Sequence, residues 1–95
     1  MLIETPYKEG DTVSIKLSSG EEIIARLEQE TNDTLKLYKP LMVAMTQQGL
    51  GLAPFMFTVA PDTKINISTK NVLCIAKTMD EMSKQYVQNT TGIAI

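Results

Sequence analysis

The chain has 95 residues, of which 43% are hydrophobic and 21% are charged, and its formal net charge is −2. These values are typical of one small globular domain, and no apolar run is long enough to cross a bilayer, so we expect a cytoplasmic protein without a membrane partner. One cysteine excludes an internal disulfide, and the lack of histidine removes the usual general base and the commonest metal ligand. We therefore expect no enzymatic activity, no metal and no cofactor.

The charges are spread unevenly along the chain. Residues 1–33 carry three cations and eight carboxylates, whereas residues 34–79 carry five lysines and one aspartate. An ordinary solvated surface is the simpler interpretation of this pattern. The alternative is a mildly basic face on an otherwise acidic protein, which would suit an anionic partner.

Three successive segments between residues 11 and 37 alternate apolar and polar side chains. A period of two predicts strands with one buried and one exposed face. The breaks at 18–20 and 31–33 are short and rich in Ser, Gly, Asn and Asp, which is typical of turns. We therefore predict a three-stranded antiparallel meander, whose apolar face the rest of the chain must cover. Its apolar positions are Val13, Ile15 and Leu17, then Ile23, Ala25 and Leu27, then Leu35 and Leu37.

The second of these strands extends to Glu28 or Glu30. Ile24 then lies on its outward face, where we expect either a helix or a neighbouring subunit to cover it. The third strand begins near Thr34 and contains Pro40, which cannot donate a ladder hydrogen bond. We predict an edge position, a bulge or a sharp bend there, and a bend would let the strand change partners at the proline. Beyond the proline, Leu41, Val43 and Met45 keep the parity of Leu35 and Leu37, so we expect them on the same face.

The next part of the chain is richer in glycine and in apolar residues. We predict a loop at 46–52, in which Leu50 and Leu52 suit either a contact with another chain or packing on the protein's own surface. We predict strands at 54–60 and 71–76, both apolar on both faces and therefore covered on both sides. A short alternating segment, Lys64–Ser68, lies between them.

The last part of the chain predicts one short helix. Thr78 and Glu81 have the spacing of a capping box, with a hydroxyl at the N-cap and a carboxylate three residues later. The helix would span 79–88 and precede a tail at 89–95 that ends in Ile93, Ala94 and Ile95. Its apolar face would consist of Met79, Met82 and Tyr86.

Together these elements predict a single mainly β domain over residues 1–95: a small, five-stranded, strongly bent antiparallel sheet or open barrel with one C-terminal helix. Pairing strand four of one subunit with strand five of the next would satisfy both open edges and close a homo-oligomeric ring. The alternative is a monomer in which the helix and the tail cover these strands. The candidate interface residues are Phe55, Met56, Phe57, Val72 and Leu73.

Two stretches resemble the motifs of Sm-like proteins, and in particular those of the divergent Sm-like proteins that marine phages (cyanophages) carry. The first is Val13-x-Ile15-x-Leu17-x-x-Gly20-x-x-Ile23-Ile24-Ala25-x-Leu27 with Leu35-x-Leu37, and the second is Ile67-x-x-x-Asn71-Val72-x-x-Ile75. The resemblance implies an Sm-like barrel, a ring joined through strands four and five, and single-stranded RNA bound near the pore. It also implies a post-transcriptional role or the handling of phage RNA.

The chain departs from the family pattern at three places. The loop before strand three contains Thr31–Thr34 where the family usually has Asp-x-aromatic/apolar-x-Asn. Ser68–Lys70 stands where Arg-Gly or an equivalent Lys-His is usual. The helix usually precedes the first strand, and here it follows the last one. These changes leave the expected fold intact, but they weaken the expectation of RNA binding because they fall on base-stacking and arginine positions.

In an Sm arrangement the two altered loops would lie close together. Amides and hydroxyls can hydrogen-bond the edges of unstacked bases, and a lysine can pair with phosphate. Ordinary turn chemistry explains the same residues equally well. The candidate RNA-binding residues are Asn32, Asp33, Ser68, Thr69 and Lys70, and we expect no DNA partner.

A second functional hypothesis is a structural or assembly protein, such as a component of a virus particle, that uses the ring to hold protein. Catalysis has little support, because the serines lack a histidine partner and Cys74 lies inside an apolar strand, where a thiol is normally inert.

Overall fold

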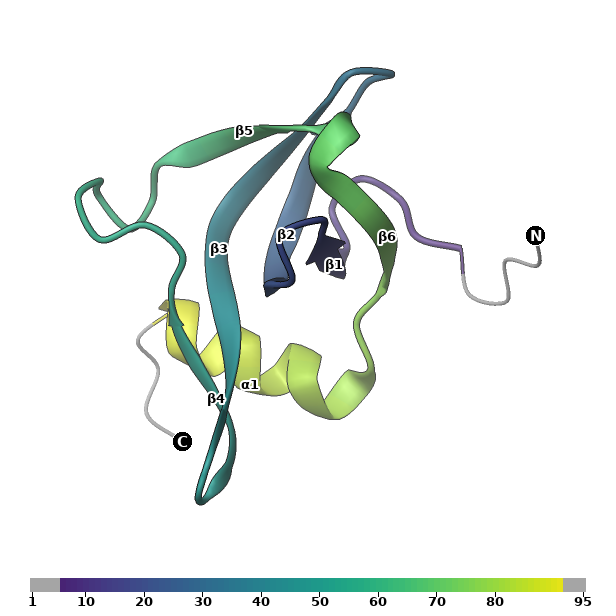
Figure 1. Ribbon diagram of the computed structural model, residues 1–95. Coiled ribbons are helices and arrows are strands. Elements are labelled where there is room, and N and C mark those ends of the chain that lie inside the picture. The colour runs from purple at the N-terminus through teal and green to yellow at the C-terminus, as the bar shows by residue number, and fades with distance from the viewer. Residues whose placement is uncertain (1–5, 92–95) are drawn as a thin grey trace.

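Antiparallel strands form one strongly bent sheet (Figure 1). The computed structural model describes residues 6–91. Its strands are β1 (Thr12–Leu17), β2 (Glu22–Glu30), β3 (Thr34–Thr46), β4 (Gly49–Pro54), β5 (Lys64–Ser68) and β6 (Val72–Lys77). A 3-10 turn, η1 (Thr69–Asn71), joins β5 to β6, and the helix α1 (Asp80–Thr91) follows β6.

The strand order is β4-β3-β2-β1-β6, and β5 also pairs with β3. The predicted meander is confirmed: β1 pairs with β2 and β2 with β3, each antiparallel. The sheet has six strands rather than the predicted five, because the partner of β3 is divided into β4 and β5. The fold class, a bent antiparallel sheet with one C-terminal helix, is as predicted.

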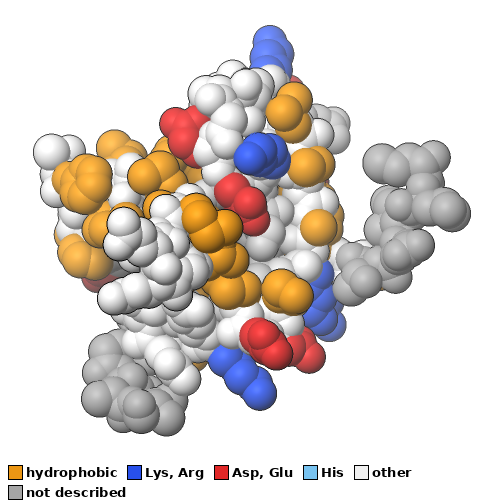
Figure 2. All heavy atoms as spheres, turned by 60° about the horizontal axis from the view of Figure 1, so that its bottom comes forward, with side chains coloured by type: hydrophobic (Ala, Val, Ile, Leu, Met, Phe, Trp, Pro, Cys, Tyr) orange, Lys and Arg blue, Asp and Glu red, His pale blue; other side chains and the backbone are white. Residues whose placement is uncertain are grey.

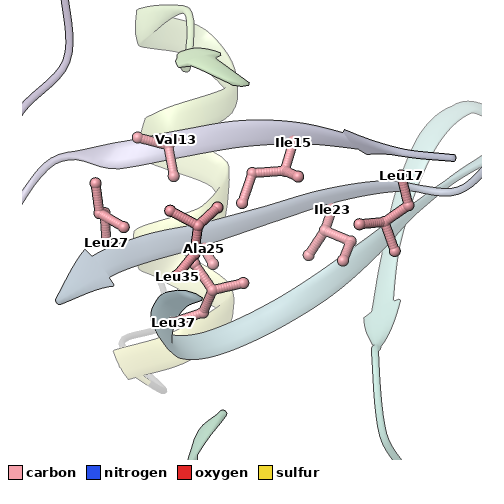
Figure 3. Close-up of a cluster of buried hydrophobic side chains, with 8 residues drawn as sticks. All are labelled: Val13, Ile15, Leu17, Ile23, Ala25, Leu27, Leu35 and Leu37. Atoms are coloured by element: carbon pink, nitrogen blue, oxygen red, sulfur yellow. The ribbon is translucent and has the colours of Figure 1, made fainter. Parts of the chain in front are cut away.

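The core lies on the concave face of the sheet, at the alternate positions that the sequence indicates (Figure 3). None of these side chains is more than 7% exposed. Burying each aliphatic side chain contributes about 1.5–3 kcal/mol, which makes this face the main source of stability. The core residues are Val13, Ile15, Leu17, Ile23, Ala25, Leu27, Leu35 and Leu37, with Tyr7, Phe55, Ile67, Val72 and Ile75 packed against them.

β3 contains a bulge at Lys39 and Pro40. Ile24 pairs with Leu41, and Arg26 pairs with Tyr38. Between these two pairs β2 has one residue and β3 has two, so β3 carries one extra residue. Lys39 has a φ of 50°, which non-glycine residues rarely adopt. The extra residue reverses which face the later side chains occupy. The prediction that Leu41, Val43 and Met45 lie on the core face is therefore wrong, because they share the outward face with Ile24.

The partner of β3 changes at this bulge, as predicted. β5 pairs with β3 up to Tyr38, and β4 pairs with it from Leu41 onward. Between β4 and β5 the chain leaves the sheet as residues 55–63, which we call the excursion and which projects at the left of Figure 1. The predicted strand at 54–60 is therefore wrong, because the bend at Pro40 ends the ladder that this segment would need. The last backbone hydrogen bond from this segment to β3 runs from the Phe55 amide to the Pro40 carbonyl, at 3.4 Å.

The predicted loop at 46–52 is also wrong, because β3 and β4 form a hairpin with a turn of only two residues, Gln47 and Gln48. The Thr46 hydroxyl donates to the Gly49 carbonyl at 2.7 Å and accepts from the Gln48 amide at 3.2 Å. Gly49 has a φ of 110°, which a side chain would disfavour. The glycines that suggested a loop therefore serve the turn and an edge strand.

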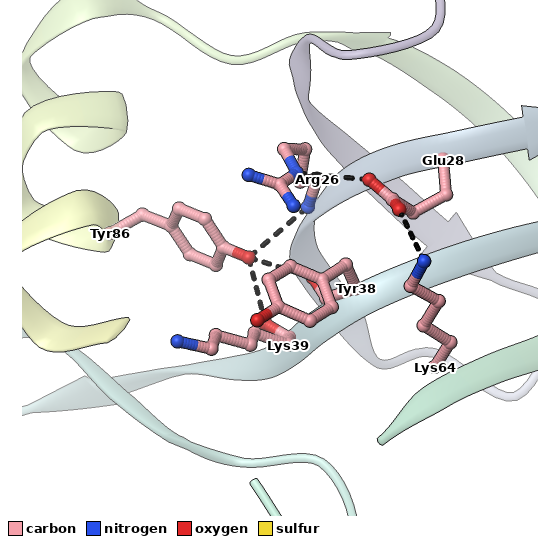
Figure 4. Close-up of polar contacts among 6 residues, drawn as sticks. All are labelled: Arg26, Glu28, Tyr38, Lys39, Lys64 and Tyr86. Atoms are coloured by element: carbon pink, nitrogen blue, oxygen red, sulfur yellow. Dashed lines mark hydrogen bonds and ion pairs between the residues drawn. The ribbon is translucent and has the colours of Figure 1, made fainter. Parts of the chain in front are cut away.

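α1 covers the outward face of the bend, and it is attached there through Tyr86 (Figure 4). The Tyr86 hydroxyl accepts from the Arg26 amide at 3.2 Å and lies within donor distance of the Tyr38 and Lys39 carbonyls, at 2.8 and 2.9 Å. It therefore fills the gap that the bulge opens in the β2–β3 ladder. Ile24 is only 1% exposed beneath this helix, so the helix is its cover, which is one of the two alternatives predicted.

The helix begins one residue later and ends three residues later than predicted, at Asp80 and Thr91. Thr78 does not act in the predicted capping box, because its hydroxyl lies 2.8 Å from that of Ser14 and its amide donates to the Thr12 carbonyl. The predicted tail beyond Thr91, with Ile93–Ile95, lies outside the described residues. Within residues 6–91, neither helical segment has the length and apolar character needed to cross a membrane.

Replacing Tyr86 with phenylalanine tests the contact between α1 and the bulge. Tyr86→Phe keeps the buried ring but leaves the Arg26 amide and two carbonyls without the hydroxyl, so we expect the free energy of unfolding to fall by about 1–3 kcal/mol. Urea denaturation measures this loss. Tyr7→Phe is the matched control, because the Tyr7 hydroxyl donates to the exposed Glu30 carboxylate, and it should cost about 0.5 kcal/mol or less. Equal losses in the two variants would contradict the role of Tyr86.

The same contact predicts a loss of stability in alkali. Burial raises the pKa of the Tyr86 hydroxyl to about 12, above its ordinary value of 10.0. Between these two values the unfolded chain binds fewer protons than the folded one, so the free energy of unfolding falls as the pH rises from about 10 to about 12. Urea denaturation across this range should show a steeper decline for the wild type than for Tyr86→Phe. Parallel declines would contradict this prediction.

Candidate nucleic-acid interface

The β2–β3 turn and η1 lie side by side at one end of the sheet. Thr34 pairs with Ser68 in the β3–β5 ladder, which brings the two connections together. The Thr69 amide donates to the Asp33 carbonyl and the Thr69 hydroxyl donates to the Asn32 carbonyl, both at 2.9 Å. The expected proximity of the two loops is therefore confirmed, and we call residues 31–33 with 68–70 the loop pair.

Hydroxyl groups hold each half of the loop pair in shape. The Thr31 hydroxyl accepts from the amides of Asp33 and Thr34, at 3.3 and 3.0 Å. The Ser68 hydroxyl accepts from the Lys70 amide at 3.2 Å and so caps η1. Sequence reasoning missed the role of Thr31, although a threonine two or three residues before such amides is a known turn signal.

The loop pair presents polar side chains on a rigid backbone. Asn32, Asp33 and Lys70 are exposed, whereas Ser68 and Thr69 are half-buried. The Asn32 amide can both donate to and accept from a base edge, and Lys70 can pair with phosphate. Asp33 offsets the charge of Lys70, so the loop pair has no net charge of its own. Its chemistry therefore suits hydrogen bonding to a base better than electrostatic attraction of a strand.

A charged cluster occupies the outward face next to the bulge (Figure 4). The Glu28 carboxylate lies 3.0 Å from the Lys64 ammonium and 3.0 Å from Arg26 Nε. The hydrogen bond from Lys64, and then that from Arg26, lower the pKa of the Glu28 carboxyl below its ordinary value. The Arg26 guanidinium lies over the Tyr38 ring, with 4.4 Å between its central carbon and the ring centroid. Sequence reasoning missed this cluster, which joins three strands.

Three strands of the sheet have an open edge. Within residues 6–91, β4 and β5 each pair only with β3, and β6 pairs only with β1. Of the candidate interface residues, Val72 and Leu73 lie on β6, and the other three lie in the excursion. Phe55 and Val72 pack against the protein's own core, so they are less available to a partner than predicted. Met56, Phe57 and Leu73 are 41%, 78% and 67% exposed.

Other apolar side chains are exposed around α1 and the β3–β4 hairpin. Figure 2 brings forward the end of the molecule that carries α1, where hydrophobic side chains lie among charged ones of both signs. Met45, Leu50 and Met79 are 77%, 46% and 67% exposed. The apolar residues of the excursion border a hollow of about 320 Å³, which Asn89 and Thr90 close on the helix side.

Comparison with known proteins gives similarity among solved structures. No protein-family model matches the chain, and no curated protein matches it. Among solved structures, it is similar to a heptameric archaeal Sm protein, whose crystal structure was described for its implications for the eukaryotic snRNP core. The two share 18% sequence identity and a TM-score of 0.51, over 75% of this chain and 90% of the archaeal chain. At this identity the likeness shows the fold alone, and it confirms the Sm-like fold expected from the two motifs.

Proposed function

We propose that this chain forms a closed ring of identical subunits and binds single-stranded RNA at the loop pair. The observation that carries the proposal is the pair of hydrogen bonds from Thr69 to the Asn32 and Asp33 carbonyls, within a fold similar to that of a ring-forming Sm protein. These bonds hold two polar loops as one surface. The motif resemblance suggests post-transcriptional handling of RNA in the cytoplasm, including that of a phage-infected host.

The open edges of β5 and β6 support the ring. An open edge presents a row of unpaired amides and carbonyls, and pairing it with another chain satisfies them. β5 and β6 are different surfaces, so their contact is heterologous and can propagate around a closed ring. Leu73 on β6 is 67% exposed, and a neighbouring subunit would remove this side chain from water.

The chemistry of the loop pair supports RNA as the ligand. Sequence-selective recognition of RNA uses unstacked bases that hydrogen-bond to polar side chains and to the backbone. Asn32 and Lys70 are exposed within the loop pair and supply an amide and a cation. In a ring, the loop pairs of successive subunits would repeat this chemistry, and many weak contacts to one strand would add up.

Leu73→Asp tests the ring. A carboxylate at this edge would have to be buried without a partner in the proposed contact, so we expect the variant to be a monomer, whereas the wild type has the mass of a multimer. Light scattering during gel filtration gives both masses. Met79→Asp is the matched control, because Met79 is also 67% exposed but precedes α1, and it should leave the mass unchanged. A wild-type monomer, or a Leu73→Asp variant of wild-type mass, would contradict the ring.

Lys70→Gln tests the RNA site. Fluorescence anisotropy of a labelled oligouridine, titrated at several salt concentrations, should show tight binding by the wild type. Losing one phosphate contact should reduce the slope of log affinity against log salt by about 0.7 for each bound subunit. Lys84→Gln, an equal change of charge on the exposed side of α1, is the control and should have no such effect. A ring that binds no RNA would contradict this part of the proposal and favour the assembly hypothesis.

A further inference from the structure

We propose that the outward face of β2, β3 and β5 is a second contact surface, along which a bound RNA strand continues from the loop pair. This inference rests on the proposed function, because it takes single-stranded RNA as the ligand. It concerns a row of side chains on three neighbouring strands, which meets the loop pair at Ser68. We call this surface the outward track.

The outward track consists of side chains that the register aligns in rows across three strands. Arg26 pairs with Tyr38, and Tyr38 pairs with Lys64. Two residues further along β3, Gln29 pairs with Lys36, and Lys36 pairs with Asn66. Core residues Leu35 and Leu37 alternate with these positions, so the rows lie on the opposite face from the core. The third row, Thr34 with Ser68, borders the loop pair.

The charge of the outward track is positive, in a protein whose net charge is −2. Arg26, Lys36 and Lys64 are its cations, and Glu28, which bonds two of them, is the carboxylate that lies among them. The charge asymmetry in the sequence thus resolves into a local basic surface. Cations attract the phosphates of a single strand in a salt-dependent manner.

The outward track also carries a flat cation that is held in place. Arg26 lies over the Tyr38 ring and is bonded by Glu28 at 3.0 Å, so its guanidinium is fixed before any ligand arrives. RNA-binding proteins stack unpaired bases on guanidinium planes as well as on aromatic rings. This arrangement supplies the flat platform that the loop pair lacks. The amides of Gln29 and Asn66, in the next row, are exposed and can bond a base edge.

The outward track leads directly into the loop pair. Ser68 belongs both to the third row of the outward track and to the cap of η1. Lys70 therefore lies on one side of the Thr34–Ser68 pair, and the row that contains Lys36 lies on the other. Rows two residues apart are separated by about 7 Å along a strand, so the three rows span about 13 Å. Beyond Arg26, α1 occupies the outward face, and its Tyr86 hydroxyl accepts a hydrogen bond from the Arg26 amide. The outward track therefore ends at Arg26 on this side.

The length of the RNA distinguishes the two surfaces. A labelled oligouridine of about 4 nucleotides should occupy the loop pair alone, whereas one of about 15 should also cover the outward track. We would measure the affinity of both probes for the wild type and for the double variant Lys36→Gln/Lys64→Gln. Lys16→Gln/Lys84→Gln is the matched control, because it removes two exposed lysines of β1 and α1.

We expect the Lys36→Gln/Lys64→Gln variant to bind the short probe as the wild type does. Its salt slope for the long probe should fall by about 1.4 for each bound subunit, because two phosphate contacts are lost. Arg26→Lys keeps the charge but loses the planar guanidinium. It should therefore weaken binding of the long probe several-fold without changing the salt slope. Circular dichroism and light scattering would confirm that each variant keeps the wild-type fold and mass.

Three results would overturn the inference, and they separate it from the proposed function. If the double variant and its control bind the long probe equally, the outward track is not a contact surface, while binding that still depends on Lys70 keeps the loop-pair site. If the wild type binds both probes equally tightly, no second surface exists. If the wild type binds neither probe, both proposals fail together.

Discussion

The bulge in β3 and the Tyr86 hydroxyl that fills it are the contact on which the rest of the structure depends. A bulge frees backbone groups of β2 and β3, and buried backbone groups need partners. One hydroxyl serves the Arg26 amide and the carbonyls of Tyr38 and Lys39. Lys39 also donates from its ammonium to the Thr90 carbonyl, at 2.6 Å. The bend of the sheet and the position of α1 therefore stabilise each other.

The bend decides which surfaces remain for binding. Because β3 reverses its inward and outward faces at Pro40, Leu41 and Val43 lie on the outward face with Ile24, and Leu35 and Leu37 before the proline fill the core. The outward face before the bulge is left to polar and charged residues, and this face adjoins the loop pair. The excursion leaves the sheet at the same point and carries Phe57 into solvent, where it is 78% exposed. Apolar and basic surfaces are thereby separated on one small domain.

The helix that covers the sheet comes from the C-terminal end of the chain, whereas the motif resemblance implies a helix before the first strand. α1 follows β6, and its buried face contacts the outward side of the bend. A small domain buries a limited share of its surface, so one added helix matters to its stability. The loop pair, at the far end of the sheet from α1 in Figure 1, stays open. Stability and the proposed binding therefore depend on separate parts of the molecule.

The sequence by itself determined the meander, its eight core positions, the C-terminal helix and the Sm-like fold, because a period of two and short polar turns are local properties. Through the motif resemblance, it also predicted that the two candidate loops lie close together. Only the tertiary structure decided that residues 55–63 leave the sheet, that Gly49–Pro54 form a strand, and that Arg26, Tyr38 and Lys64 share a row. These features depend on the added residue in β3. Pro40 indicates a bulge or a bend at this point, but the resulting register is set by pairing with distant strands and by Tyr86, which no local pattern describes.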